Sequence, residues 1–261
     1  MVNGFDSFRE KFRGYEDCYT IIGGTACDIL MGEVGMDFRA TKDIDMILLI
    51  EERFAEFAAV FWEYIKAGGY RCGWKNAAIP HFYRFTEPQM HGYPVIIELF
   101  SRRPDFQMNR TDIHLTPLPV SDEISSLSAI MLDDNYYRLM LEGRRTVDGV
   151  SVLGAEYLIL FKMKAWLDLR QKKKTGAHVN ERDLRKHKND VFRLFSLVEP
   201  SARITVSPAV EADMRQFMRA IPDESVDLVQ LGIGEISLEE ILYTLERMFV
   251  VPDEIELHSA F

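Results

Sequence analysis

The sequence is poor in cysteine, with only Cys18, Cys27 and Cys72. The count is odd and no two of the three have the CxxC spacing, which excludes a disulfide framework and a zinc ribbon. Cys18 and Cys27 stand among apolar neighbours, and we expect both to be buried thiols.

Long hydrophobic runs are also missing. No uninterrupted apolar stretch reaches the ~18 residues that a membrane span needs, and the N-terminal segment has no apolar signal core. Together with the free thiols, this predicts a reduced, soluble, cytoplasmic protein that has no membrane partner.

Positively charged residues are fewer than negatively charged ones. The chain has 31 Lys and Arg against 41 Asp and Glu, a formal net charge of −10. This balance argues against broad, sequence-independent nucleic-acid binding, which needs a basic surface. It still permits a local basic patch around a polyanionic substrate. The 47% of hydrophobic residues is enough for a sizeable core.

The order of the predicted elements indicates an α/β (α+β) protein, with a mixed sheet domain at 1–153 and a helical domain at 154–261. In the first domain, strands are expected at 18–22, 43–50, 70–74, 81–85 and 95–100, and helices at 5–13, 25–36, 52–67 and 124–141. A hairpin or a last strand is expected at 146–153, then helices at 155–171, 180–198, 208–220 and 238–249. The basic run 172–174 is interpreted as a solvated loop between two of these helices.

Two short motifs in the first domain carry chemistry. Gly23 and Gly24 lie between a strand and a helix, where the backbone can approach a phosphate and the helix N-terminus offers free N–H groups. The hydroxyl of Thr25 would add a donor there. Asp43 and Asp45 alternate along a strand and point to the same side. Such a carboxylate pair stays ionised when a cation lies between the two, and Mg²⁺ suits hard oxygen ligands.

A third carboxylate would complete a two-metal site. Glu98 is the candidate, because it is embedded in an otherwise apolar strand, where an acid is costly unless it is paired. Glu87 is an alternative, although the adjacent Pro88 favours a turn. Another interpretation makes Glu98 an edge-strand acid paired with Arg102 or Arg103.

The order Gly-Gly-Thr-Ala at 23–26, Asp-Ile-Asp at 43–45 and a lone acid on a later strand resembles the nucleotidyltransferase superfamily of DNA polymerase β type. With Arg39 and Thr41 before the acids, it resembles the AbiEii group, the nucleotidyltransferase toxins of type IV abortive-infection toxin–antitoxin systems. The segment 157–165, with Lys162, resembles one half of the lysine motif of that family, and 183–191 resembles the other half. There, His187 stands where an acid is commoner.

The resemblance implies metal-dependent transfer of NMP from an NTP to an acceptor hydroxyl on an RNA such as tRNA, a protein or a small molecule, with a possible antitoxin partner. It implies that Asp43, Asp45 and Glu98 hold Mg²⁺ or Mn²⁺ and act in catalysis. Gly23, Gly24, Thr25, Arg39, Lys162 and Lys186 would bind the nucleotide, in a cleft between the two domains.

Each motif also has a simpler interpretation. A Gly-Gly turn is often only conformational, and glycosyltransferases also use Asp-x-Asp with Mn²⁺. Lysine on an amphipathic helix normally extends to solvent, and Lys186 with Asp190 has the i,i+4 spacing of a surface ion pair. A catalytically idle member that binds a nucleotide or a partner protein is therefore the alternative function.

Overall fold

The computed structural model describes residues 2–49, 53–74, 82–100, 115–117, 130 and 133–252. The chain folds as two compact units. The first comprises Met1–Leu132 and Gly143–Gly154, and the second comprises Asp133–Glu142 and Ala155–Phe261. The domain boundary expected at 153 stays a prediction, and the segment Asp133–Glu142 belongs to the second unit.

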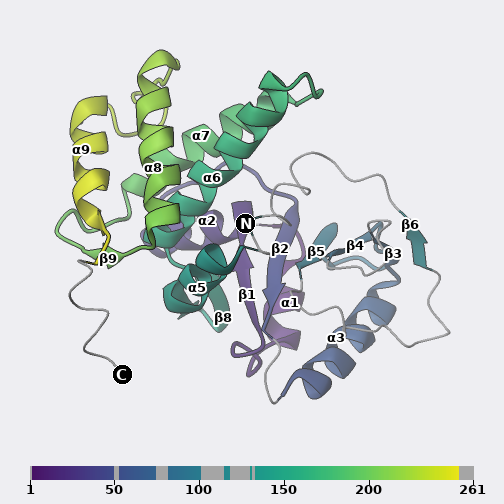
Figure 1. Ribbon diagram of the computed structural model, residues 1–261. Helices are drawn as coiled ribbons and strands as arrows, with labels where there is room; N and C mark the ends of the chain where they lie inside the picture. Colours follow the sequence, from purple (N-terminus) through teal and green to yellow (C-terminus); the bar gives the residue numbers. More distant parts are fainter. Residues whose placement is uncertain are drawn as a thin grey trace. The chain divides into compact units, whose positions relative to one another are not determined.

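The first unit is built on a mixed sheet (Figure 1), which has eight strands within the described ranges, in the order β6-β3-β4-β5-β2-β1-β8-β7. The strands are β1 (Tyr19–Ile22), β2 (Asp43–Leu48), β3 (Arg71–Trp74), β4 (Phe82–Thr86), β5 (Ile96–Phe100), β6 (Leu115–Pro117), β7 (Arg144–Val147) and β8 (Val150–Leu153). The helices are α1 (Phe5–Lys11), α2 (Gly23–Glu33) and α3 (Phe54–Gly68). Parallel and antiparallel pairs are both present, so the predicted α+β class with a mixed sheet is confirmed.

Aromatic side chains form the core on one face of this sheet. Phe12, the residue that follows α1, packs on Phe57 and Phe61 of α3. Phe57 stacks on Tyr19 of β1, and Phe61 contacts Phe85 of β4. Successive residues of a strand point to opposite faces of a sheet. The side chains that alternate with this aromatic core are therefore directed to the other face.

A tight hairpin ends the first unit. Val147 of β7 is paired with Val150 of β8, and the two residues between them, Asp148 and Gly149, have φ of 49° and 76°. Positive φ at both central positions is the signature of a type I′ turn, which Asp-Gly favours. The hairpin expected at 146–153 is therefore confirmed, and its first strand begins two residues earlier.

The second unit contains helices α5 to α9 (Figure 1). They are α5 (Asp134–Gly143), α6 (Ala155–Lys174), α7 (Glu181–Phe195), α8 (Pro208–Ala220), the 3-10 helix η1 (Ile221–Asp223) and α9 (Leu238–Met248). The first part of the helix expected at 124–141 lies outside the described residues. Two short strands that the sequence does not predict, β9 (Ile204–Thr205) and β10 (Phe249–Val250), pair in parallel. The side chain of Asn180 accepts from the backbone N–H of Arg182 and so caps α7, which agrees with the helix start expected at 180.

The prediction of a loop at the basic run 172–174 is wrong. The run forms the last turn of α6, where cations interact favourably with the negative end of the helix dipole. Cys18 and Cys27 are buried, as predicted. Burial, with the nearby Asp17 carboxylate, raises the pKa of Cys18 to about 12. Among the described residues, no helix is both long and apolar enough to span a bilayer.

Candidate metal centre

The register of three adjacent strands, β2, β5 and β4, brings charged residues side by side on the face opposite the aromatic core. Asp45 of β2 lies opposite Ile22 of β1 on one side and opposite Glu98 of β5 on the other. Glu98 in turn lies opposite Arg84 of β4. Residues directly opposite each other in a sheet share a face, so the strands themselves align these three charged side chains.

Asp43, Asp45 and Glu98 form a compact carboxylate group. One oxygen from each lies within 4.8 Å of the others. Asp45 is 5% exposed and Glu98 is 3% exposed, whereas Asp43 is half-buried at the start of β2. Ionised carboxylates that are this close and this poorly hydrated repel each other strongly unless a cation compensates them.

The donor set fits a hard divalent cation. Bonds from Mg²⁺ to oxygen are about 2.1 Å, so two ligands on opposite sides of one ion lie about 4.2 Å apart. The separations here, up to 4.8 Å, are larger by an amount that small side-chain rotations can remove. All three donors are oxygen atoms, and neither His nor Cys is in the group, which favours Mg²⁺ or Mn²⁺ over Zn²⁺.

Glu98 is paired with a residue that no sequence motif indicates. Nε of Arg84 lies 3.3 Å from Oε1 of Glu98. The interpretation of Glu98 as an edge-strand acid is wrong, because β5 lies between β2 and β4 in the sheet. Its alternative partners, Arg102 and Arg103, lie outside the described residues. The cation of Arg84 offsets part of the negative charge that burial concentrates at this site.

The loop before β2 orients the first aspartate. Oδ1 of Asp43 accepts a hydrogen bond from the hydroxyl of Thr41 at 3.0 Å and one from the backbone N–H of Lys42 at 3.3 Å. The Thr25 hydroxyl donates to the backbone carbonyl of Asp43 at 2.5 Å. Thr25 therefore ties the start of α2 to the start of β2, and its oxygen retains only acceptor capacity for a ligand.

The two glycines make room for the acids. Gly23 has φ of 69°, in the left-handed region, and a Cβ there would overlap Oδ2 of Asp45. A Cβ on Gly24 would lie 2.9 Å from the Thr41 hydroxyl oxygen and 3.4 Å from Nη2 of Arg39. Glycine is therefore required at these first two positions of α2 by their close approach to Asp45 and Thr41.

We expect Gly23→Ala to weaken divalent-metal binding as well as folding. The left-handed backbone alone costs a non-glycine residue about 1–2 kcal/mol. Gly35→Ala is the matched control, because Gly35 has φ of 72° but a Cβ added there would meet no atom within 4 Å. Urea unfolding should show a loss in both variants, and a Mn²⁺ titration should show reduced affinity only in Gly23→Ala. Equal Mn²⁺ affinities would contradict the role of Gly23 beside Asp45.

Arg39 and Glu87 have different surroundings. The guanidinium of Arg39 stacks over the Phe38 ring at 4.9 Å and lies beside Gly24, at the N-terminal end of α2. Glu87 is exposed, has φ of 54° and pairs with Arg71 at 2.8 Å, and it is not part of the carboxylate group.

The two predicted lysines belong to the helical unit. Nζ of Lys162 lies 3.0 Å from Oδ2 of Asp190, and both residues are buried. Lys186 is partly exposed, with Nζ 3.9 Å from Asp183. The interpretation of Asp190 as a surface partner of Lys186 is wrong, because Asp190 is 0% exposed. His187 is also buried. A role for either lysine beside a nucleotide stays a prediction.

Comparisons with known proteins identify no family. No protein-family model and no curated protein matches the sequence. Among solved structures, the chain is similar to an antigenic nucleotidyltransferase-like protein from Paracoccidioides brasiliensis, with 16% identity over 87% of this chain and 89% of that chain, at a TM-score of 0.45. This likeness is distant. It carries no conclusion about activity, and the AbiEii resemblance rests on the sequence motifs alone.

Proposed function

We propose that this protein is a metal-dependent nucleotidyltransferase, which transfers NMP from an NTP to an acceptor hydroxyl. The observation that carries the proposal is the group of three carboxylates, two of them buried, beside a glycine turn that opens a helix. Metal-dependent transfer to a hydroxyl requires such a group, because both the triphosphate and the attacking oxygen carry negative charge.

The chain's own residues account for three requirements. Asp43, Asp45 and Glu98 would hold a divalent ion, which would supply charge neutralisation for the triphosphate. Among the described residues, no side chain caps the N-terminus of α2, so its first N–H groups remain as donors for phosphate oxygens. Thr41 and Lys42 keep the Asp43 carboxylate oriented toward the group.

The finer parts of the proposal rest on the motifs alone. In this proposal Arg39, Lys162 and Lys186 neutralise the nucleotide, the acceptor is an RNA such as tRNA, a protein or a small molecule, and an antitoxin protein is the partner. An acceptor hydroxyl would lose its proton to a carboxylate of the group, with Glu98 as metal ligand or general base. Its oxygen would then bond to the α-phosphorus as the bond to the β-phosphate breaks and pyrophosphate leaves.

The experiment is a transfer assay with α-labelled NTPs, Mg²⁺ and three acceptor pools, namely tRNA, the protein itself and small hydroxyl compounds. We expect label to move to one pool and to stay in the NTP when EDTA replaces Mg²⁺. Nucleotide binding without transfer to any pool would instead identify a catalytically idle nucleotide-binding protein.

A further inference from the structure

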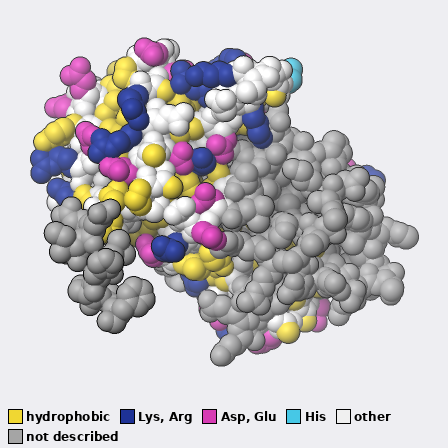
Figure 2. All heavy atoms as spheres, in the orientation of Figure 1, with side chains coloured by type: hydrophobic (Ala, Val, Ile, Leu, Met, Phe, Trp, Pro, Cys, Tyr) yellow, Lys and Arg dark blue, Asp and Glu magenta, His cyan; other side chains and the backbone are white. Residues whose placement is uncertain are grey.

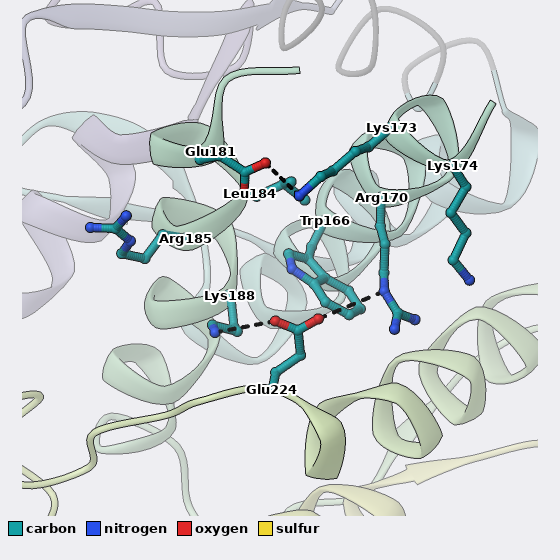
Figure 3. Close-up of a pocket in the computed structure, with 9 residues that line it drawn as sticks. All are labelled: Trp166, Arg170, Lys173, Lys174, Glu181, Leu184, Arg185, Lys188 and Glu224. Atoms are coloured by element: carbon teal, nitrogen blue, oxygen red, sulfur yellow. Dashed lines mark ion pairs between the residues drawn. The ribbon is translucent and has the colours of Figure 1, made fainter. Parts of the chain in front are cut away.

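The helical unit contains a basic pocket of about 440 Å³ (Figure 3). Its lining comes from α6, α7 and the residue that follows η1: Trp166, Arg170, Lys173, Lys174, Glu181, Leu184, Arg185, Lys188 and Glu224. Pockets of roughly 300–1,000 Å³ hold small-molecule ligands. The pocket lies wholly within the second unit, so its geometry is independent of the carboxylate group in the first unit.

The charge of the lining is opposite to that of the whole chain. Five cationic side chains face two carboxylates in the pocket, whereas the chain has a net charge of −10. Lys174 and Arg185 are exposed, and neither has an ion-pair partner in the part of the chain that the structure describes. Figure 2 shows Lys and Arg side chains gathered over the C-terminal end of α6 and the N-terminal end of α7. Such a concentration of charge attracts a polyanion.

Of the cationic side chains that line the pocket, Arg170 is the one best positioned to bind an anion. Its guanidinium lies over the ring of Trp166 at 5.0 Å, and Trp166 is held in turn by an edge contact with Phe217. Among the described residues, Arg170 forms no hydrogen bond, and its ion pair with Glu224 is long, at 3.8 Å. A guanidinium that stacking holds in place, with its N–H groups unused, matches the bidentate geometry of a phosphate.

Glu224 occupies the position where an anion would bind. Its carboxylate lies between Arg170 and Lys188 (Figure 3), 3.8 Å from the first and 3.6 Å from the second. Both separations exceed those of charge-assisted hydrogen bonds, about 2.7–2.9 Å. The carboxylate therefore neutralises the two cations without satisfying their donors. The ammonium of Lys188 donates instead to the backbone carbonyl of Ser225 at 2.7 Å.

We propose that this pocket is a binding site for a small polyphosphate anion, such as pyrophosphate or the phosphate chain of a nucleotide. The guanidinium of Arg170 holds one phosphate group, and Lys174 and Arg185 neutralise the rest, whereas Lys173 is already paired with Glu181. The excess of three positive charges in the lining suits a ligand that carries several negative charges. Glu224 competes with the ligand for the two cations and so limits its affinity.

Isothermal titration of the full chain with pyrophosphate, ATP and AMP in EDTA tests the site. Without metal, the carboxylate group repels phosphates, so the measured heat of binding comes from the basic pocket. We expect pyrophosphate and ATP to bind, and AMP to bind at least about tenfold more weakly because it has fewer charges. Similar affinities for pyrophosphate and ATP identify the phosphate chain as the ligand, and tighter ATP binding identifies a nucleotide.

Two variants should move the affinity in opposite directions. Arg170→Gln should weaken pyrophosphate binding at least about tenfold, the equivalent of one charge-assisted hydrogen bond. Glu224→Gln should tighten binding, because the competing carboxylate is removed. Arg182→Gln is the matched control, since Arg182 is exposed on α7 outside the pocket. The proposal is overturned if pyrophosphate does not bind at millimolar concentration, if Arg182→Gln weakens binding as much as Arg170→Gln, or if Glu224→Gln weakens it.

Discussion

Asp45→Asn is expected to lower nucleotidyl transfer at least about 100-fold, because even residues that only support a metal ligand cost 10–100-fold when they are changed. Asparagine keeps the shape of the side chain and removes its charge. Asp45 lies centrally between the β1–α2 turn and Glu98, and it is 5% exposed, so water cannot substitute for the lost carboxylate.

The same substitution should leave the fold intact or slightly more stable. Removing one of three neighbouring negative charges relieves their repulsion in the metal-free protein. Urea unfolding in EDTA should therefore give an unfolding free energy for Asp45→Asn that equals or exceeds the wild-type value. Mn²⁺ binding, followed by electron paramagnetic resonance, should weaken in parallel with transfer.

Glu98→Gln and Glu87→Gln form a matched pair. Both replace a glutamate that is paired with an arginine, Arg84 and Arg71 respectively. Only Glu98 belongs to the carboxylate group. Transfer and Mn²⁺ binding should therefore fall in Glu98→Gln and stay at the wild-type level in Glu87→Gln. Wild-type activity in both Asp45→Asn and Glu98→Gln would rule out the carboxylate group as the catalytic centre.

Lys162→Met is expected to destabilise the protein by on the order of 3–5 kcal/mol, the usual cost of removing one partner of a buried ion pair. The side chains of Lys162 and Asp190 are 4% and 0% exposed. Without Lys162, the Asp190 carboxylate keeps the longer contact with Arg193, at 3.4 Å. Thermal or urea unfolding measures the loss.

Lys164→Met is the control for this prediction. Lys164 is on the same helix and pairs with Asp168 and Asp213, but its side chain is 24% exposed. Partial solvation should limit its loss to about 1 kcal/mol. Equal losses of unfolding free energy in the two variants would show that the buried Lys162–Asp190 pair stabilises the protein no more than the partly exposed pairs of Lys164 do.

A double variant separates structure from catalysis. Lys162→Met with Asp190→Leu removes both charges, and replacing a buried ion pair by apolar side chains is often neutral for stability. If Lys162 acts only within the helical unit, the double variant should recover both stability and transfer. Recovered stability with transfer still abolished would support the predicted role of Lys162 beside the triphosphate.

Local patterns in the sequence are sufficient to predict most of the helices and strands. Helix α8 begins and ends where its periodicity predicts, at Pro208 and Ala220, and the Asp148-Gly149 turn forms the expected hairpin. These features depend on interactions within a few residues. The prediction for the basic run 172–174 fails because lysine has good helix propensity, and no glycine marks the end of the helix before Gly176.

The part of the site that depends on strand pairing is harder to predict from the sequence. Arg84 stands among aromatic residues in β4, and an isolated arginine in such a strand is the signal that could have marked it. Its partner cannot be named from the sequence, because the register between β4 and β5, which are joined by a loop, decides the partner. Thr41 is predictable only as a motif residue, and its contact with Asp43 depends on the fold of that loop.

The sequence by itself determined that Asp43 and Asp45 share a face of one strand, because side chains alternate with a period of two whatever surrounds the strand. It also indicated that a helix begins close to Gly23 and Gly24, although α2 starts at Gly23 itself rather than at the predicted residue 25. Only the tertiary structure decided that Glu98 and Arg84 stand beside Asp45, and that Asp190 is a buried partner of Lys162. Those neighbours are far apart in the chain, so sheet register and helix packing, rather than local backbone preference, bring them together.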